Sequence, residues 1–206
     1  LDSFMYQTVG SEGIEMIAES MGLPLYRQSI SGTSLLQSME YEKTEGDEVE
    51  DLFELLSRVK QAHPNVQGVS VGAILSSYQK LRVENVCERL GLTPLACLWE
   101  RDQQELLHEM FENQIEAILI KVAAVGLNEK HLGMTLGQME PKLLSLRDKF
   151  GVHPCGEGGE YETFVLDSPL MKKRIRVVES EVIMLTPDEV APVAYLRMHK
   201  LQLEDK

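Results

Sequence analysis

Residues 116–125 read EAILIKVAAV, an almost unbroken apolar run that contains one lysine, Lys121. A run in which apolar residues do not alternate with polar ones is typical of a strand buried on both faces, as in a parallel sheet covered by helices. Two segments with helical periodicity flank it, residues 103–113 and 136–151. We therefore expect the run to be a strand of a parallel sheet.

The same alternation continues toward the N-terminus. Helices are expected at residues 3–21, 47–63 and 76–91, strands at 23–30, 66–75 and 93–99, and a loop at 31–46. Strands that alternate with helices predict an α/β fold with right-handed crossovers. After residue 155 the pattern changes, because TFVLD, RIRVVES, EVIMLT and VAYLRMHKLQLED are strand-like and no helix of similar length separates them. The sequence thus predicts an α/β domain followed by a smaller β-rich C-terminal region.

Composition excludes several functional classes. The 206 residues carry a net charge of −13, which argues against general affinity for nucleic acid or an anionic membrane. No apolar run approaches the roughly 20 residues of a membrane-spanning helix. The three cysteines, Cys87, Cys97 and Cys155, are odd in number and lack metal-site spacing, which favours free thiols in a reducing compartment such as the cytoplasm. We assign no residue to a metal.

Ligands of an open parallel sheet bind where the strands end and helices begin. Small or apolar residues end the expected strand 66–75 and would let a ligand approach the backbone, and polar residues follow at the start of the next helix. The candidates are Gly72, Ala73, Ile74, Ser76, Ser77, Tyr78, Gln79, Lys80 and Arg82. The helix N-terminus suits a phosphate, and Arg82 suits an oxyanion. The equally favoured alternative is a capped helix with a solvated face, on which Lys80 and Glu84 pair.

Lys121 also has two interpretations. A lysine inside a buried run needs a partner or a route to the edge. It can meet a phosphate or an acidic residue near the end of its strand, or extend its amine to solvent as a structural residue.

Two polar clusters are predicted to be structural. Asp47, Glu48, Glu50 and Asp51 crowd the first turn of helix 47–63, where they suit the helix dipole. His153 and Cys155 are close in sequence, but this alone is poor support for a nucleophilic pair, because no third, orienting group can be named.

Residues 156–163, GEGGEYET, concentrate glutamates on a glycine-rich backbone. Glycines permit tight turns that fix side chains in an array. Glutamates accept protons or surround a cation, and an aromatic ring adds a cation–π surface. A solvated acidic turn is the alternative. The position between the α/β region and the β-rich region favours a site for a cationic guest or a proton transfer.

The stretch GVHPCGEGGEYETFVLDSPL at 151–170 resembles the signature of diphthine–ammonia ligases, the amide synthases that complete diphthamide on elongation factor 2. DSFMYQTVG near the start, EGDEVEDLFELL at 45–56 and GVSVGAILSSYQKLRVENVCERLGL at 68–92 agree with it. The resemblance spans essentially the whole chain.

The resemblance implies an N-type ATP pyrophosphatase with a HUP-like α/β nucleotide-binding domain. Such an enzyme uses ATP and magnesium to activate a carboxylate as an acyl-adenylate, and ammonia then displaces AMP. Diphthine carries a trimethylammonium group beside that carboxylate. The resemblance places the substrate and catalytic residues at Glu157, Gly158, Gly159, Glu160, Tyr161, Glu162 and Thr163. It places ATP along Gly72–Arg82, with Lys121 toward the phosphates. Tyr161 would face the cation, and the three glutamates would divide the binding of trimethylammonium and ammonium.

Family members also carry an S-G-G-K-D-S pyrophosphate loop, upstream of the stretch that matches DSFMYQTVG, and the chain does not contain it. We expect upstream residues to supply it, and we expect no ligase activity from a chain without it. The predicted division is an ATP-binding domain at 1–135 and a substrate-binding region at 136–206. The alternatives are a non-catalytic nucleotide-binding protein of the same fold, or another N-type pyrophosphatase that amidates or thiolates a small molecule or RNA.

Overall fold

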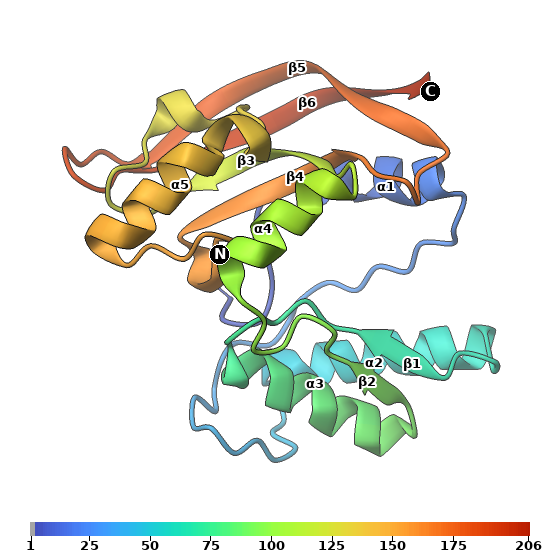
Figure 1. The fold of residues 1–206 in the computed structure, drawn as a ribbon. Coiled ribbons are helices and arrows are strands. Elements are labelled where there is room, and N and C mark those ends of the chain that lie inside the picture. Colours follow the sequence, from blue (N-terminus) through green and yellow to red (C-terminus); the bar gives the residue numbers. More distant parts are fainter. Residues whose placement is uncertain (1–2) are drawn as a thin grey trace. The chain divides into compact units, whose positions relative to one another are not determined.

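The computed structural model describes residues 3–206, whose contacts form two compact units. The first unit contains Tyr26–Arg101 and the described residues up to Tyr6, and the second contains Gln7–Leu25 and Asp102–Lys206. Figure 1 shows the elements of both units. The structure is therefore mixed α/β, with a separate sheet in each unit.

The first unit contains helices α2 (Glu48–Ala62) and α3 (Ser77–Leu90) and a two-stranded parallel sheet. Strands β1 (Gly68–Ser70) and β2 (Thr93–Leu95) pair in parallel, so the predicted parallel sheet is confirmed here, with strands shorter than expected. The core of this unit is a cluster of buried apolar side chains on the two helices and nearby loops: Met5, Val49, Val83, Val86, Cys87 and Leu92.

Local sequence explains where the two helices begin and end. The Asp47 side chain accepts the Val49 N–H at the start of α2, and the Ser76 hydroxyl accepts the Gln79 N–H at the start of α3. Helix α3 ends at Gly91, whose φ of 62° is in the left-handed region that glycine tolerates. Both predicted helices are confirmed within one residue at each end.

The second unit is built on a four-stranded antiparallel sheet with the order β4-β3-β6-β5. Its strands are β3 (Glu116–Val122), β4 (Tyr161–Asp167), β5 (Lys173–Thr186) and β6 (Val193–Asp205). The β-rich character expected after residue 155 is thus confirmed. The expectation that 116–125 belongs to a parallel sheet is wrong, because β3 pairs antiparallel with both β4 and β6.

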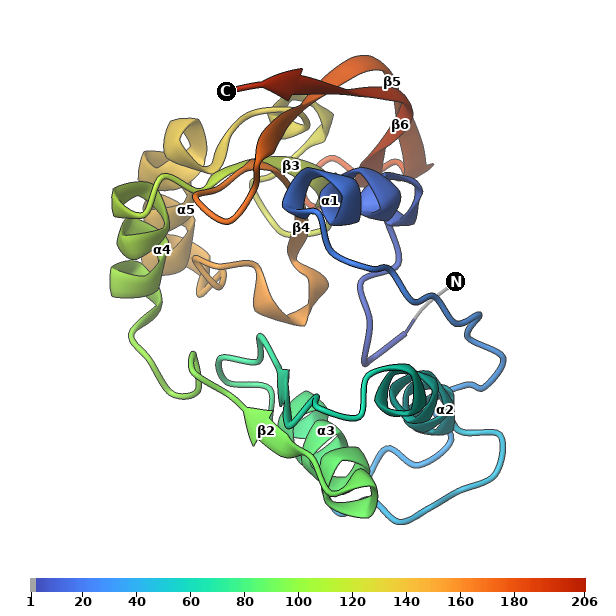
Figure 2. The same ribbon diagram turned by 90° about the vertical axis from the view of Figure 1, so that its right-hand side faces the viewer.

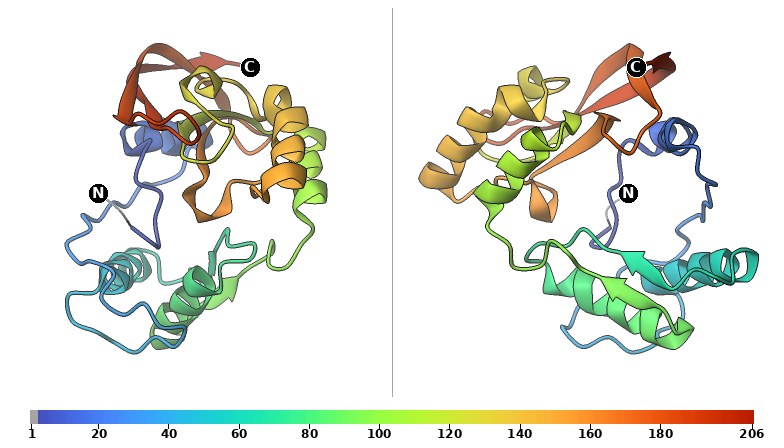
Figure 3. Two further views of the ribbon diagram at one scale, coloured as in Figure 1. Left: turned by 90° about the vertical axis from the view of Figure 1, so that its left-hand side faces the viewer. Right: turned by 45° about the vertical axis from the view of Figure 1, so that its right-hand side comes forward.

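Burial on both faces explains why the apolar sequence of β3 resembles that of a strand in a parallel sheet. Ala117 and Leu119 belong to the apolar cluster that also contains residues of α4 (Gln103–Glu112) and α5 (Leu136–Phe150). Ile118 and Ile120 belong to the opposite cluster, against which α1 (Ile14–Met21) packs. Figures 2 and 3 show α4 and α5 on one side of the sheet and α1 on the other. Periodicity reports burial, and not the direction of the neighbouring strands.

The N-terminal expectations are partly wrong. The helix predicted at 3–21 is helical only from the short 3-10 helix η1 (Ser11–Gly13) onward into α1. Gly10 has a φ of 82°, which interrupts a helix, and a Cβ on Gly13 would lie 2.4 Å from the ring of Phe164. No strand forms at 23–30, whereas 31–46 is irregular, as predicted.

The predicted division after residue 135 concerns ATP and substrate binding, which these contacts do not test. The contacts themselves separate the two units after Arg101. Across residues 3–206, no helix is both long enough and apolar enough to span a membrane.

Candidate functional site

Residues 153–163, called the acidic loop from here on, follow α5, contain the 3-10 helix η3 (Glu157–Gly159) and run into the first three residues of strand β4. Gly158 and Gly159 have φ values of 83° and 77°, and a Cβ built on either would meet no atom within 4 Å. A Cβ on Gly156 would instead lie 2.7 Å from the Tyr161 carbonyl oxygen. The backbone at 158–159 is therefore open to a ligand, whereas the glycine at 156 serves packing.

His153 connects the parts of the acidic loop. Its backbone N–H donates to Glu160 Oε2 at 2.6 Å. Its ring Nδ1 accepts the Cys155 N–H at 3.1 Å and the Glu157 N–H at 3.4 Å. Since Nδ1 is the acceptor, the neutral ring carries its proton on Nε2.

The Nε2 atom of His153 faces a carboxylate. It lies 3.4 Å from Glu157 Oε2, and the two side chains are only 13% and 12% exposed. Burial lowers the pKa of His153, although the nearby Glu157 and Glu160 charges oppose that shift. The imidazole therefore favours its neutral form, and sequence reasoning missed this role because it examined His153 only as part of a nucleophilic pair.

Glu162 lies directly opposite Lys121 in the β4–β3 ladder. Lys121 Nζ donates to Glu162 Oε1 at 2.7 Å, and the side chains are 18% and 10% exposed. Glu162 Oε2 is buried without a hydrogen bond. Of the two partners proposed for Lys121 from sequence, the structure contains the acidic residue.

Tyr161 and Thr163 are strand residues of β4. Tyr161 is only 3% exposed within the α4–α5 side of the core, and its hydroxyl donates to the Pro154 carbonyl. Burial, together with the charges of Cys155 and Glu160, raises the pKa of Tyr161. The Thr163 carbonyl accepts from Gln7 Nε2 at 3.3 Å. Tyr161 is therefore a packing group in this structure, and its predicted contact with a cation has no geometric support here.

Apart from Lys121 in β3, the residues expected near ATP belong to the first unit, from the end of β1 into α3. A Cβ on Gly72 would meet nothing within 4 Å, so the backbone there is open. Ala73 and Ile74 are buried at 3% and 5% exposure, and Ser76 caps α3. Open backbone beside a capped helix start fits the close approach of a nucleotide phosphate.

The polar residues farther along α3 have structural partners. Arg82 is fully buried; its guanidinium lies 3.3 Å from the Tyr78 ring centroid and donates to the carbonyls of Leu36 and Ser38. The Tyr78 hydroxyl lies 2.7 Å from Ser34 Oγ. Buried in this way, Arg82 has no surface to offer an oxyanion.

Gln79 and Lys80, also near the start of α3, are paired as well. Gln79 Nε2 donates to the Met5 carbonyl at 3.1 Å. Lys80 pairs with Glu84 at 2.6 Å, as the structural alternative predicted.

The acids at the start of α2 are also structural, as predicted, but they act on a loop as well as on the helix dipole. Asp47 Oδ2 accepts the N–H groups of Leu35 and Leu36, and Asp51 Oδ2 accepts those of Ser31 and Gly32. Together with Arg82, these carboxylates hold segment 31–46 against α2 and α3.

A metal ion has no ready protein site in the part of the chain that the structure describes. No three His, Cys, Asp or Glu side chains among residues 3–206 lie close enough together to hold one. Magnesium would therefore not fit a protein cluster of the described residues.

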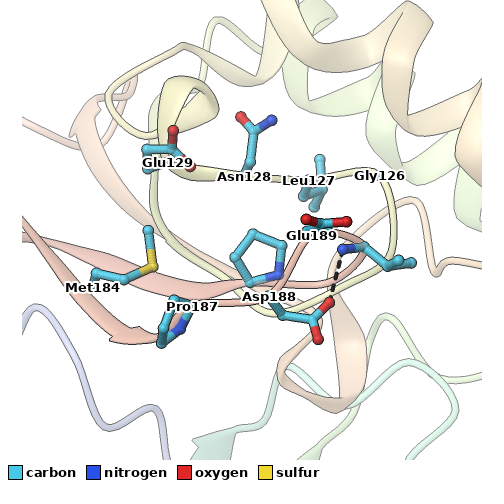
Figure 4. Close-up of a pocket in the computed structure, with 10 residues that line it drawn as sticks. Gly126, Leu127, Asn128, Glu129, Met184, Pro187, Asp188 and Glu189 are labelled. Atoms are coloured by element: carbon cyan, nitrogen blue, oxygen red, sulfur yellow. Dashed lines mark hydrogen bonds between the residues drawn. The ribbon is translucent and has the colours of Figure 1, made fainter.

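A surface pocket of about 260 Å³ lies in the second unit. Figure 4 shows it between Gly126–Glu129 and the β5–β6 connection, which includes Pro187 and Asp188. The Asp188 carboxylate accepts the N–H groups of Val190 and Ala191 in its own turn. This pocket gave no signal in the sequence beyond the turn-forming stretch TPDEVAP.

Two family models match the chain. The model of the diphthamide synthase N-terminal domain matches residues 1–94, and that of the diphthamide synthase C-terminal domain matches residues 102–188. Residues 95–101, between the two matches, end where the contacts divide the two units, and residues 189–206 lie beyond the second match.

Curated proteins named diphthine–ammonia ligase are similar along the whole chain. The human protein is 61% identical over 207 residues, which cover all of this chain and 77% of the relative. The zebrafish protein, from Danio rerio, is 58% identical over 207 residues, which make up 81% of its length. The Schizosaccharomyces pombe protein is 53% identical over 206 residues, which make up 33% of its length.

Proposed function

The chain belongs to the diphthine–ammonia ligase family, and from this premise we propose that it is a ligase that joins ammonia to the carboxylate of diphthine to form the amide of diphthamide. The reaction forms a carbon–nitrogen bond, and ATP supplies the free energy. Family membership favours this function over the non-catalytic nucleotide-binding alternative and over amidation of another substrate.

In the proposed chemistry, the diphthine carboxylate attacks ATP, and pyrophosphate leaves as an acyl-adenylate forms. Ammonia then attacks the acyl carbon, the carbon–nitrogen bond forms, the bond to the AMP oxygen breaks, and the excess proton passes to solvent. The substrate carrier is elongation factor 2, and the compartment is the cytoplasm. The net charge of −13 supports a basic protein partner better than nucleic acid.

The nucleotide site proposed here is the open backbone at Gly72–Ile74 with the start of α3 at Ser76, in a unit of HUP-like fold. Support comes from the parallel β1–β2 pair that precedes and follows α3, and from the space above Gly72. Tyr78, Gln79 and Arg82 shape this site through the contacts that hold segment 31–46 and Met5. Lys121 acts through Glu162, with which it pairs, and not through a phosphate.

Magnesium would be held mainly by the nucleotide phosphates, as is common for this ion, and not by a cage of protein side chains. Bound there, it would supply neutralisation of phosphate charge.

The observation that carries the proposal is the acidic loop. Three glutamates are held in a fixed array by His153, Lys121 and the backbone, beside open backbone at Gly158 and Gly159. Carboxylates ordered beside open backbone suit the two cations of the reaction, the trimethylammonium group of diphthine and ammonium. Thr163 contributes its backbone to β4.

The test is an assay of the protein with diphthine-bearing elongation factor 2, ATP, magnesium and ammonium. We expect AMP and pyrophosphate in equal amounts and a mass change on the target that corresponds to a carboxylate becoming an amide. Elongation factor 2 without diphthine is the control. Release of AMP without amidation of this target would favour another substrate, and the absence of AMP would favour the non-catalytic alternative.

A further inference from the structure

We infer that His153 is a positioning residue of the amidation site, whose neutral ring organises the acidic loop through Nδ1 and places a buried Nε2, without a hydrogen-bond partner among the described residues, 3.4 Å from the Glu157 carboxylate. The inference rests on the proposed function for its catalytic consequence. Its structural part stands on the contacts of His153 alone.

Those contacts act on several parts of the loop at once. The backbone N–H of His153 holds Glu160, and ring Nδ1 holds the backbone at 155 and 157. A side chain with a single acceptor atom near its Cβ reproduces the Nδ1 contacts, whereas only the full ring also reaches Glu157. Nδ1 therefore fixes the backbone of Glu157, while Nε2 lies 3.4 Å from its carboxylate without a hydrogen bond.

The ring tautomer decides which ring nitrogen can accept a hydrogen bond and which carries the proton. With the proton on Nε2, the ring places an N–H group 3.4 Å from the carboxylate of Glu157, a side chain that is 12% exposed, outside hydrogen-bonding geometry. Protonation would place hydrogen on Nδ1, which faces two backbone N–H donors, and those contacts would be lost. A protonated ring would also form an ion pair with Glu157 and compete with a cationic substrate.

The charged and titratable groups around the ring belong to η3 and to the residues beside it. Glu157 belongs to η3, and Glu160 and Cys155 belong to the same loop. The Cys155 thiol donates to the Gln103 carbonyl of α4, and burial raises its pKa to about 11, so it remains neutral. The lowered pKa of His153 agrees with the neutral ring that the hydrogen bonds require.

The first test needs no substrate. Nitrogen NMR of the whole protein, with the His153 signals assigned through the His153→Asn variant, reports the tautomer and the titration of the ring. We expect an unprotonated Nδ1, a protonated Nε2 and titration below the ordinary histidine value of 6.5. A proton on Nδ1 at neutral pH, or an ordinary titration, would overturn the inference.

The second test measures ligase kinetics at varied ammonium concentration. Since a neutral hydrogen bond is worth about 0.5–1.5 kcal/mol, loss of the two Nδ1 bonds in His153→Ala should raise the KM for ammonium roughly 5- to 100-fold and leave the KM for ATP within about twofold. His153→Asn keeps an acceptor near the Nδ1 position. Compared with His153→Ala, it should therefore be more stable to heat and should have a KM for ammonium closer to that of the wild type. His108→Ala, at an exposed site in α4, is the matched control.

The outcomes of the two tests separate the two proposals. If the wild-type protein forms no amide, the proposed function fails, while the NMR result still decides the role of His153. If the wild type is active and both His153 variants match it in ammonium KM, the positioning role is wrong and the function stands.

Discussion

At the scale of single residues, the structure replaces several expected ligand contacts with internal ones. Lys121, expected to meet a phosphate or an acid, pairs with Glu162, and Arg82, expected to clamp an oxyanion, is fully buried against backbone carbonyls. A buried cation needs a partner, and sequence alone does not say whether that partner belongs to the protein or to a ligand. The residues that retain open space are glycines, whose lack of a side chain is the useful property.

Removing Lys121 should destabilise the second unit. In Lys121→Met the Glu162 carboxylate, 10% exposed, would lose its only cationic partner in the described contacts, at a cost of about 2 to 4 kcal/mol. Lys121→Met combined with Glu162→Leu should recover most of this loss, because neither charge is then buried. Denaturant unfolding measures both. Lys173→Met, which breaks an exposed pair with Asp205, is the control and should cost less than about 1 kcal/mol. Equal losses for the single and double variants would contradict this account.

The glycines of the acidic loop should separate stability from activity. Gly158→Ala places a Cβ in open space at a φ of 83°, so it should cost about 1–2 kcal/mol of unfolding free energy from backbone strain alone. Gly156→Ala adds a clash with the Tyr161 carbonyl and should cost clearly more. If a ligand approaches the open backbone, Gly158→Ala should still reduce ligase activity at least tenfold at temperatures where the variant is fully folded. Thermal unfolding and the amidation assay test the two parts, and an active, folded Gly158→Ala protein would argue against close approach there.

At the scale of elements, α2 and α3 do more than pack against each other. The first turn of α2 accepts four backbone N–H groups from segment 31–46 through Asp47 and Asp51, and Arg82 of α3 donates to two of its carbonyls. Burial alone would raise the pKa of Asp51, but hydrogen bonds from Gly32 and Ser31 outweigh it and hold that pKa below its usual value. The segment has no regular structure, so these polar groups supply its order.

Arg82→Lys should therefore loosen segment 31–46 while leaving α3 formed. Lysine keeps the charge but lacks the planar fork that reaches the Leu36 and Ser38 carbonyls together while it stacks on Tyr78. Amide hydrogen exchange should show protection in 31–46 falling at least tenfold, with α3 changing less. Arg58→Lys, at an exposed position of α2, is the matched control. Unchanged protection in 31–46 would mean that the α2 carboxylates hold the segment without Arg82.

At the scale of the whole molecule, sequence predicts the order of elements well and the sheet pairing poorly. Caps and periodicity are local, so α2, α3, α4 and α5 are confirmed almost residue for residue. Strand direction depends on distant partners, so β3 was assigned to the wrong kind of sheet. The acidic loop was found from composition and from the family resemblance. The role of His153 could not be found, because it depends on which ring nitrogen meets the backbone.

The two units should respond to acid at different pH. Burial lowers the pKa of both His131 and His153 in the second unit from the ordinary value of 6.5. Their folded forms then bind fewer protons than the unfolded chain, so their stabilising effect is complete above pH 6.5 and is lost as pH falls through the folded pKa. The slope is at most about 1.4 kcal/mol per pH unit for each histidine.

The first unit depends instead on carboxylates. A hydrogen bond from Arg89, helped by one from Tyr41, lowers the pKa of Glu50 despite burial, and that of Asp51 is also lowered. Their stabilising effect lasts down to the ordinary values of 4.5 and 3.8 and is lost below them. Partial neutralisation of the −13 net charge stabilises the protein in mild acid. Because this effect acts on both units, the informative quantity is the difference between the pH values at which the two units lose protection.

Hydrogen exchange at a series of pH values, corrected for intrinsic exchange rates, should therefore show the second unit losing protection first. Between pH 6.5 and 5, amides of β3 and β4 should lose protection while those of α2 and α3 keep theirs, since His131 and His153, whose pKa burial lowers, both belong to the second unit. Replacing His131 by Gln and His153 by Asn removes both titrations and should flatten the response of the second unit over that interval. Parallel loss of protection in both units, or an unchanged response in the double variant, would show that carboxylates govern the acid stability of the whole molecule.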